Sequence, residues 1–244
     1  MMRKIVLQKH VVRVDELCEH LSVSPATVRR DLEELESLGE IQRVYGGAVN
    51  IGGRLDEPLF DDKTNIATRE KQRIAQAALK YIQPNDTIFL DGGSTILELV
   101  HLIRERSNLT VVTNSLRAAI ELAAGRPRLI LVGGEVRRLS QTVVGPLTRL
   151  TLGDLHMDKA FLGTIGLSLK EGLTTTDPGE AYTKELVMEH AREVILLADR
   201  TKIGKVSFTC SGRLEKVRVL VTDGLVDRRF LSEFRKKGIE IVRA

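Results

Sequence analysis

The chain has 244 residues, of which 42% are hydrophobic and 29% charged, and this composition excludes a disordered or fibrous protein. Its formal net charge of +4 at pH 7 permits an anionic partner without identifying one. No apolar run approaches the ~20 residues that a membrane-spanning helix needs. The two cysteines, Cys18 and Cys210, are far apart in the sequence and lack metal-ligand spacing. We therefore expect a cytoplasmic protein with no membrane partner, no metal and no cofactor.

The hydrophobic pattern divides the chain into three parts. Residues 1–52 combine two short helical patterns with a glycine-containing hairpin, and residues 53–72 have the pattern of a linker followed by a connecting helix. In residues 73–244, short apolar runs alternate with amphipathic helical patterns. The runs lie at 87–90, 109–112, 129–132, 160–162, 194–197 and 217–221. This alternation predicts an α/β domain with a mostly parallel sheet that is covered by helices.

The first two helical patterns carry apolar stripes that predict a small helical core. The stripes are formed by Val14, Leu17 and Leu21 in the first helix and by Val28, Leu32 and Leu35 in the second. Ser24 has the side chain of a helix N-cap, and Pro25 fits the first helical position, where its missing N–H costs nothing. Two such helices with a short connection predict a helix-turn-helix.

The exposed face of the second helix has the residue types of a DNA-recognition helix. Ala26, Thr27 and Arg30 lie opposite the apolar stripe, with Arg29 on its flank. The first turns of a recognition helix enter the major groove, where arginine hydrogen-bonds guanine and threonine reaches bases or phosphate. We expect Ser24 and these four residues to contact DNA.

A hairpin pattern follows the second helix directly. Residues 41–51 alternate around Gly46 and Gly47, as β-hairpins do, and they place Arg43 and Tyr45 where a wing reaches phosphate or the minor groove. The residues themselves are equally compatible with a solvated helical pair and a hairpin that bind no DNA.

Both motifs resemble the winged helix-turn-helix of DeoR-family bacterial transcriptional repressors. The resemblance rests on Ser24, on the segment Thr27–Leu32, and on Arg43-x-Tyr45-Gly46-Gly47-Ala48. It implies that residues 1–52 form a small winged helix-turn-helix DNA-binding domain, which precedes an α/β sensor domain at 73–244.

Three strand ends of the second region have residue types that suit an anion. Asp91-Gly92-Gly93-Ser94-Thr95 runs from an apolar strand into a helix, and a glycine-rich turn at a helix N-terminus presents N–H groups to phosphate. Thr113-Asn114-Ser115 and Gly133-Gly134 follow the next two strands. Ligand sites of parallel sheets form outside the carboxyl ends of the strands, so we expect the three loops to converge on one small anionic ligand.

Further candidates lie downstream, at Asp158, Lys184 and Lys202. Each also has a purely structural interpretation, because Lys184 is spaced to form a surface ion pair with Glu180, and Asp199, near Lys202, is suited to cap a turn.

The order of these segments is similar to that of the DeoR-family sensor domain, which resembles ribose-5-phosphate isomerase and glucosamine-6-phosphate deaminase. The resemblance implies a phosphosugar effector. The residues that it assigns are Ser94, Thr95 and the Asn114 loop for phosphate, Lys184 or Lys202 for added positive charge, and Asp91 and Asp158 for sugar hydroxyls.

Two functions from different classes remain. The favoured one is a transcriptional repressor of a sugar catabolism operon, with operator DNA and a phosphorylated sugar as partners. The family resemblance suggests a homodimer or homotetramer. The alternative is a phosphosugar isomerase or deaminase with an appended DNA-binding domain. The related isomerases carry an acidic pair just after the strand that matches 160–162, whereas residues 163–167 contain no acid, so we expect no catalytic residues.

Overall fold

The computed structural model describes residues 2, 5, 11–37, 41–44, 47–50, 57, 59–64, 66–224, 226 and 228–244. The chain forms two compact units, Met1–Asp56 and Glu57–Ala244. The described residues between 57 and 72, which the sequence pattern assigns to a linker and connecting helix, therefore fold as part of the second unit.

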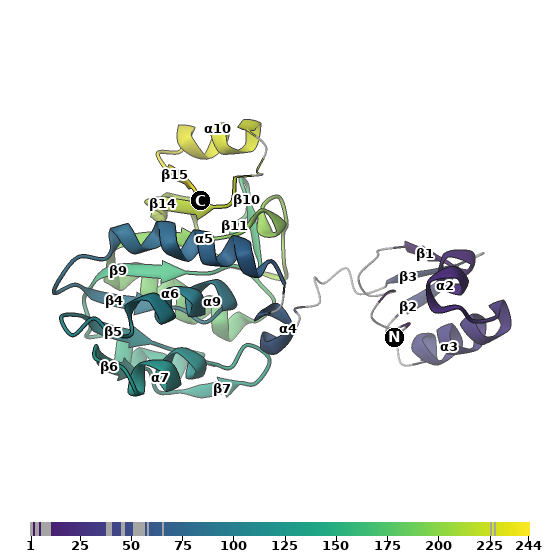
Figure 1. The fold of residues 1–244 in the computed structure, drawn as a ribbon, viewed down its shortest axis with the longest axis horizontal. Helices are drawn as coiled ribbons and strands as arrows, with labels where there is room; N and C mark the ends of the chain where they lie inside the picture. Colours follow the sequence, from purple (N-terminus) through teal and green to yellow (C-terminus); the bar gives the residue numbers. More distant parts are fainter. Residues whose placement is uncertain are drawn as a thin grey trace. The chain divides into compact units, whose positions relative to one another are not determined.

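The first unit is a helix-turn-helix with a small sheet (Figure 1). Its helices are α2 (Val14–Leu21) and α3 (Pro25–Ser37). Its antiparallel strands are β1 (Val11–Arg13), β2 (Ile41–Val44) and β3 (Gly47–Asn50), in the order β1-β3-β2. The predicted stripes meet in the core, where Leu17, Val28 and Leu32 are at most 1% exposed.

The second unit is built on a seven-stranded sheet in which every pairing is parallel. Its order is β15-β14-β12-β9-β4-β5-β6. The strands are β4 (Thr87–Leu90), β5 (Thr110–Thr113), β6 (Arg128–Leu131), β9 (Met157–Leu162), β12 (Ala191–Leu197), β14 (Val219–Thr222) and β15 (Glu240–Arg243). Each of the six predicted apolar runs overlaps one of these strands, and the predicted α/β fold is confirmed.

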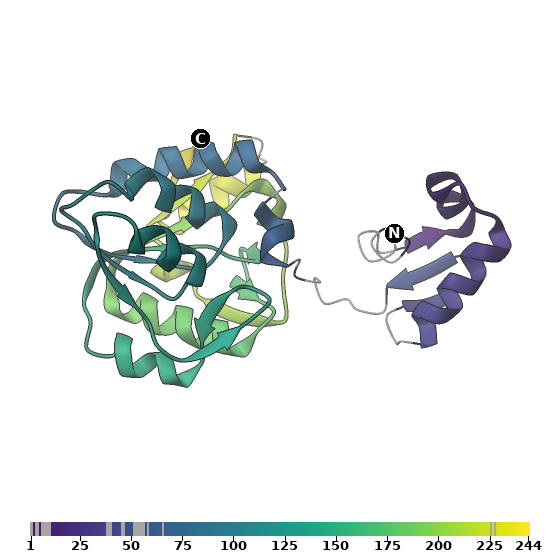
Figure 2. The same cartoon turned by 60° about the horizontal axis from the view of Figure 1, so that its bottom comes forward.

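Helices cover both faces of the sheet (Figures 1 and 2). Helices α5 (Thr68–Ala78), α6 (Ser94–Ile103) and α7 (Leu116–Ala123) pack on the face that contains Ile88 and Leu90. Helices α8 (Arg149–Leu152), α9 (Pro178–His190) and α10 (Arg228–Lys236) pack on the face that contains Phe89. None of the helices in the described ranges is both long and apolar enough to cross a membrane.

Smaller elements surround the main sheet. A short helix, α4 (Phe60–Thr64), precedes α5. The antiparallel pair β7 (Glu135–Arg137) and β8 (Thr142–Val144) follows β6. A second antiparallel sheet contains β10 (Gly166–Ser168), β11 (Gly172–Thr175) and β13 (Thr209–Gly212). Single 3₁₀ turns are η1 (Leu79–Tyr81), η2 (Pro146–Thr148), η3 (Arg200–Lys202) and η4 (Leu214–Lys216).

The chain reverses its direction of sheet growth between β4 and β9, which are neighbours in the sheet. Strands β5 and β6 add to one side of this pair, and β12, β14 and β15 add to the other side. The loops that leave the carboxyl ends of β4 and β9 therefore diverge, and such a switch point is where parallel sheets form ligand crevices.

Candidate functional site

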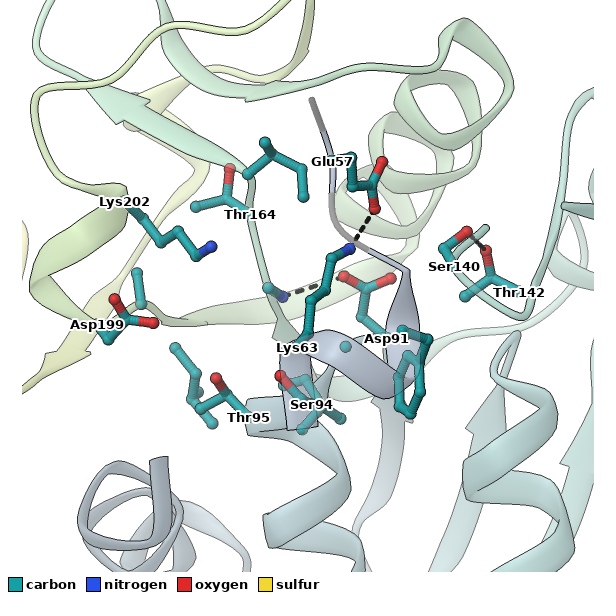
Figure 3. A pocket seen from close by; sticks show the side chains of 18 of the residues that line it. Glu57, Lys63, Asp91, Ser94, Thr95, Ser140, Thr142, Thr164, Asp199 and Lys202 are labelled. Atoms are coloured by element: carbon teal, nitrogen blue, oxygen red, sulfur yellow. Dashed lines mark hydrogen bonds and ion pairs between the residues drawn. The ribbon is translucent and has the colours of Figure 1, made fainter. Parts of the chain in front are cut away.

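A pocket lies at the carboxyl ends of β4, β9 and β12 (Figure 3). It encloses about 920 Å³ of space, including its open mouth. The lining includes four lysines and four carboxylates, namely Lys63, Lys71, Lys184, Lys202, Glu57, Asp91, Glu180 and Asp199. The charge available to a ligand therefore depends on which of these groups already pair with one another.

The N-terminus of α6 forms one wall of the pocket. Gly93 precedes the helix with a φ of 137°, a conformation that favours glycine, and no atom outside its immediate neighbours lies within 4 Å of where a Cβ would be. On Gly92, a Cβ would lie 2.0 Å from Cγ2 of Thr142. The first N–H groups of a helix have no partner within it, and no described side chain caps α6. This wall therefore offers backbone donors and a positive helix end to an anion.

Asp91 and Lys184 form a buried ion pair in the pocket, with 2.7 Å between Oδ2 and Nζ. Lys184 also donates to the carbonyl oxygen of Gly163 at 2.7 Å, and the Gly163 N–H donates to Asp91 Oδ2 at 3.0 Å. Burial raises the pKa of Asp91, and the positive charge of Lys184 counteracts that rise. Burial opposes the charge on Lys184, yet the carboxylates of Asp91 and Glu180 raise its pKa. Lys184 is thus the counterion of Asp91 in this structure.

Lys202, from η3, directs its ammonium group into the pocket (Figure 3). No residue in the described part of the chain forms an ion pair or side-chain hydrogen bond with Lys202. Burial lowers the pKa of Lys202, and the carboxylate of Asp199 counteracts this effect. Asp199 itself accepts a hydrogen bond from the Thr201 N–H at 2.8 Å, as the cap of η3. Lys202 is therefore a cation that a ligand can use without breaking an internal pair.

Two more lysines reach the pocket from the segment at 57–72. Lys71, in α5, is 5% exposed and donates to the carbonyl oxygens of Lys63 and Ile66. Burial lowers the pKa of Lys71 to about 8, although the carboxylate of Asp199 opposes this shift. Lys63, in α4, forms an ion pair and a hydrogen bond with Glu57 (Figure 3). This segment therefore supplies both positive and negative groups to the site.

The pocket brings together eight of the predicted effector residues: Asp91, Gly92, Gly93, Ser94, Thr95, Asn114, Lys184 and Lys202. Thr113 and Ser115 lie next to Asn114 but do not line the pocket. The Thr113 hydroxyl donates to the Leu90 carbonyl oxygen at 2.6 Å, and Ser115 caps α7 by accepting from the Ala118 N–H at 3.2 Å. Both side chains therefore hold the strand-to-helix turn in shape.

Two other expectations are corrected by the structure. Gly133 and Gly134 follow the edge strand β6 and lead into β7, where a Cβ on Gly134 would lie 2.9 Å from Val143 Cγ1, so they serve the turn and do not line the pocket. Asp158 lies near the start of β9 and accepts a hydrogen bond from the Thr87 N–H, at the start of β4, at 2.9 Å. It is therefore at the amino end of the sheet, opposite the pocket, and its assignment to the effector is wrong.

Sequence reasoning missed Glu57, Lys63 and Lys71, because their segment has the polar composition of a linker. Lys71 offered the one usable signal, since it lies on the same helical face as Ile74 and Ala78, which are buried. Glu180 and Asp199 entered the sequence analysis only as an ion-pair partner of Lys184 and as a turn cap, and both line the pocket.

The predicted DNA-binding face of the first unit begins at the N-terminus of α3. Ser24 caps the helix, because its hydroxyl oxygen accepts a hydrogen bond from the Thr27 N–H at 3.2 Å, and Pro25 is the first helical residue. Ala26, Arg29 and Arg30 are exposed, whereas Thr27 is half-buried. The side chain of Arg43 and the whole of Tyr45 lie outside the described residues.

Family models match both units of the chain. A model of the DeoR-like helix-turn-helix domain matches residues 1–52, and a model of the DeoR C terminal sensor domain matches residues 66–224.

Two solved structures are similar to parts of the chain. The match with eIF2B beta from Chaetomium thermophilum spans 70% of this chain and 54% of that protein, with a TM-score of 0.50 and 14% identity. At this identity the match shows a common fold alone. Ribose 5 phosphate isomerase A from Neisseria gonorrhoeae matches at a TM-score of 0.41 and 15% identity over 56% of this chain. The match spans 53% of that isomerase, about half its length.

Named relatives match over nearly the whole chain. The HTH-type transcriptional regulator GlpR of Haloferax volcanii is 36% identical over 94% of this chain and 90% of its own. The lactose phosphotransferase system repressor of Streptococcus mutans is 37% identical, covering 90% of this chain and 88% of the relative. For the glycerol-3-phosphate regulon repressor of Escherichia coli the identity is 35%, with coverage of 90% and 87%. With two family models matched in chain order and relatives of this extent, the chain belongs to the DeoR family.

Proposed function

We propose that the protein is a sequence-specific DNA-binding repressor of a sugar catabolism operon, and that a phosphorylated sugar in the pocket controls it. The observation that carries this proposal is the meeting of the uncapped α6 N-terminus with the ammonium group of Lys202 in one pocket. Backbone N–H groups and a lysine are the donors that proteins use to bind phosphate.

The rest of the pocket suits the sugar part of such a ligand. The Asp199 carboxylate can accept hydrogen bonds from hydroxyl groups, and the Thr95 and Thr164 hydroxyls can both donate and accept. The name of one relative, a glycerol-3-phosphate regulon repressor, contains a phosphorylated polyol, and that of another, a lactose phosphotransferase system repressor, contains a sugar and a phosphotransferase system. These names support a small phosphorylated polyol or sugar as the effector.

The first unit supplies the operator contacts in this proposal. Arg29, Arg30 and Thr27 lie in the first turns of α3, where a recognition helix approaches base edges. A homodimer or homotetramer would present this helix to repeated half-sites. Operator and effector then bind different states of the same protein, so each lowers the affinity for the other.

Thermal unfolding in the presence of pentose and hexose phosphates tests the effector site. A phosphosugar at 100 times its Kd should stabilise the protein by about 2.7 kcal/mol, while its unphosphorylated parent should not. Ser94→Asp places a carboxylate at the phosphate position and should abolish the response, whereas the matched Ser94→Ala variant should retain a weaker one. The carboxylate is favourable at a helix N-terminus, so the variant should keep its fold.

The same Ser94→Asp variant separates the two activities. Operator duplex selected from a random pool by the wild-type protein should bind the variant normally, but the sugar phosphate should no longer change that binding. A variant that still responds fully would show that Ser94 is only a turn residue. Turnover of any phosphosugar in these mixtures, followed by NMR, would instead favour the isomerase or deaminase alternative.

A further inference from the structure

Glu57 is the first residue of the second unit, and its carboxylate is held inside the pocket. Its side chain is 2% exposed. The carboxylate accepts hydrogen bonds from Lys63, from the Thr176 hydroxyl and from Arg137, whose Nη2 lies 2.8 Å from Oε2. Although burial by itself raises the pKa of Glu57, the Lys63 charge and these hydrogen bonds bring the pKa down to about 2. Glu57 is therefore an anion in the ligand-free protein.

Lys63 connects this carboxylate to the ligand space. Both residues line the pocket, and the Lys63 ammonium group pairs there with the Glu57 carboxylate (Figure 3). Its positive charge is already neutralised by Glu57. An anionic ligand that uses Lys63 must therefore take it from Glu57.

The charges around Arg137 make Glu57 dependent on Lys63. Arg137 pairs with three carboxylates: Glu57 at 2.8 Å, Glu180 at 3.1 Å and Asp177 at 3.4 Å. While Lys63 is present, these ion pairs contain two cations and three anions. If a ligand withdraws Lys63, one guanidinium faces three carboxylates, and like charges in a low-dielectric site repel strongly.

We propose that Glu57 is a built-in competitor of the effector, whose carboxylate holds Lys63 until an anionic ligand displaces it. This proposal rests on the proposed function, because it requires an anion in the pocket.

Calorimetric titration of the full-length protein with inorganic phosphate tests the competition. Glu57→Gln keeps the size of the side chain but removes its charge, so phosphate should bind at least about tenfold more tightly, as expected for one released charged hydrogen bond. The gain should vanish when Lys63→Gln is already present. Glu189→Gln, an exposed residue of α9, is the matched control and should leave the affinity unchanged.

The outcomes separate this proposal from the proposed function. Equal phosphate affinity of the wild type and Glu57→Gln would overturn the competition but leave the anion site standing. Tighter binding by Glu57→Gln that persists when Lys63→Gln is already present would also overturn the competition, because the gain would not depend on Lys63. Failure of phosphate to bind either protein would overturn both the competition and the anion site.

Discussion

Replacement of Lys184 by methionine is expected to destabilise the second unit strongly, because it leaves the buried carboxylate of Asp91 without its counterion. Removal of one partner of a buried ion pair costs about 3–5 kcal/mol. For a domain of this size, each kcal/mol lowers Tm by about 2–4 °C, so Tm should fall by about 6–20 °C. The Gly163 N–H still donates to Asp91 in the variant, and this favours the lower part of the range.

The pH dependence identifies the cause of that loss. Burial raises the pKa of Asp91, and without Lys184 nothing in the pair counteracts the rise. A carboxyl whose folded pKa lies above its unfolded pKa binds more protons in the folded state, so stability falls as pH rises through this interval. The deficit of Lys184→Met relative to wild type should therefore shrink when the pH is lowered from about 7 to about 5.

Urea unfolding followed by far-UV circular dichroism is a suitable assay, since the chain contains no tryptophan. The double variant Asp91→Asn/Lys184→Met should recover much of the lost stability and lose the pH dependence, because neither charge remains. Lys170→Met is the matched control, since the Lys170 side chain is 91% exposed, and should be nearly neutral. A single variant as stable as wild type, or one that the second substitution fails to rescue, would refute the counterion role.

Three further predictions concern both units. Arg29→Ala/Arg30→Ala should lose about 1–3 kcal/mol per base contact in a gel-shift titration while the melting curve is unchanged, and a normal footprint would refute the recognition-helix assignment. Val28→Asp buries a charge where Val28 is 0% exposed, so calorimetry should show the first unit unfolded and the second intact; normal stability with lost DNA binding would contradict the face assignment. Lys202→Met should weaken the effector about tenfold or more in a thermal-shift titration with little change in unliganded Tm, and an unchanged affinity would place the phosphate elsewhere.

The strands inside the sheet could be predicted from the sequence because burial on both faces makes them continuous apolar runs. The run at 87–90 coincides with β4. Strand β15 escaped detection because the charged residues Glu240 and Arg243 leave only Ile241 and Val242 as its apolar run. The three-residue strands β7, β8 and β10 are too short to establish a period.

The candidate site was predictable only where its residues follow an apolar strand. The loop at 91–95 satisfies this condition, and it forms the wall at α6. Asp158 was assigned through the family resemblance alone, although it precedes the apolar run at 160–162, and β9 begins at Met157, so the residue opens the strand. Tertiary packing brings Glu57 and Lys63 to the pocket, and the local sequence does not indicate such a placement.

The switch point between the neighbouring strands β4 and β9 also affects how the second unit folds. Strands β4, β5 and β6 each pair with the strand next to them in the chain. By contrast, the contact between β4 and β9 joins residues far apart in sequence, since Thr87 and Asp158 are 71 residues apart. The entropy lost on closing a loop grows with its length, so we expect the two halves of the sheet to form before they join. The pocket takes its lining from both halves and exists only after that step. A ligand bound there should therefore slow unfolding far more than it accelerates folding.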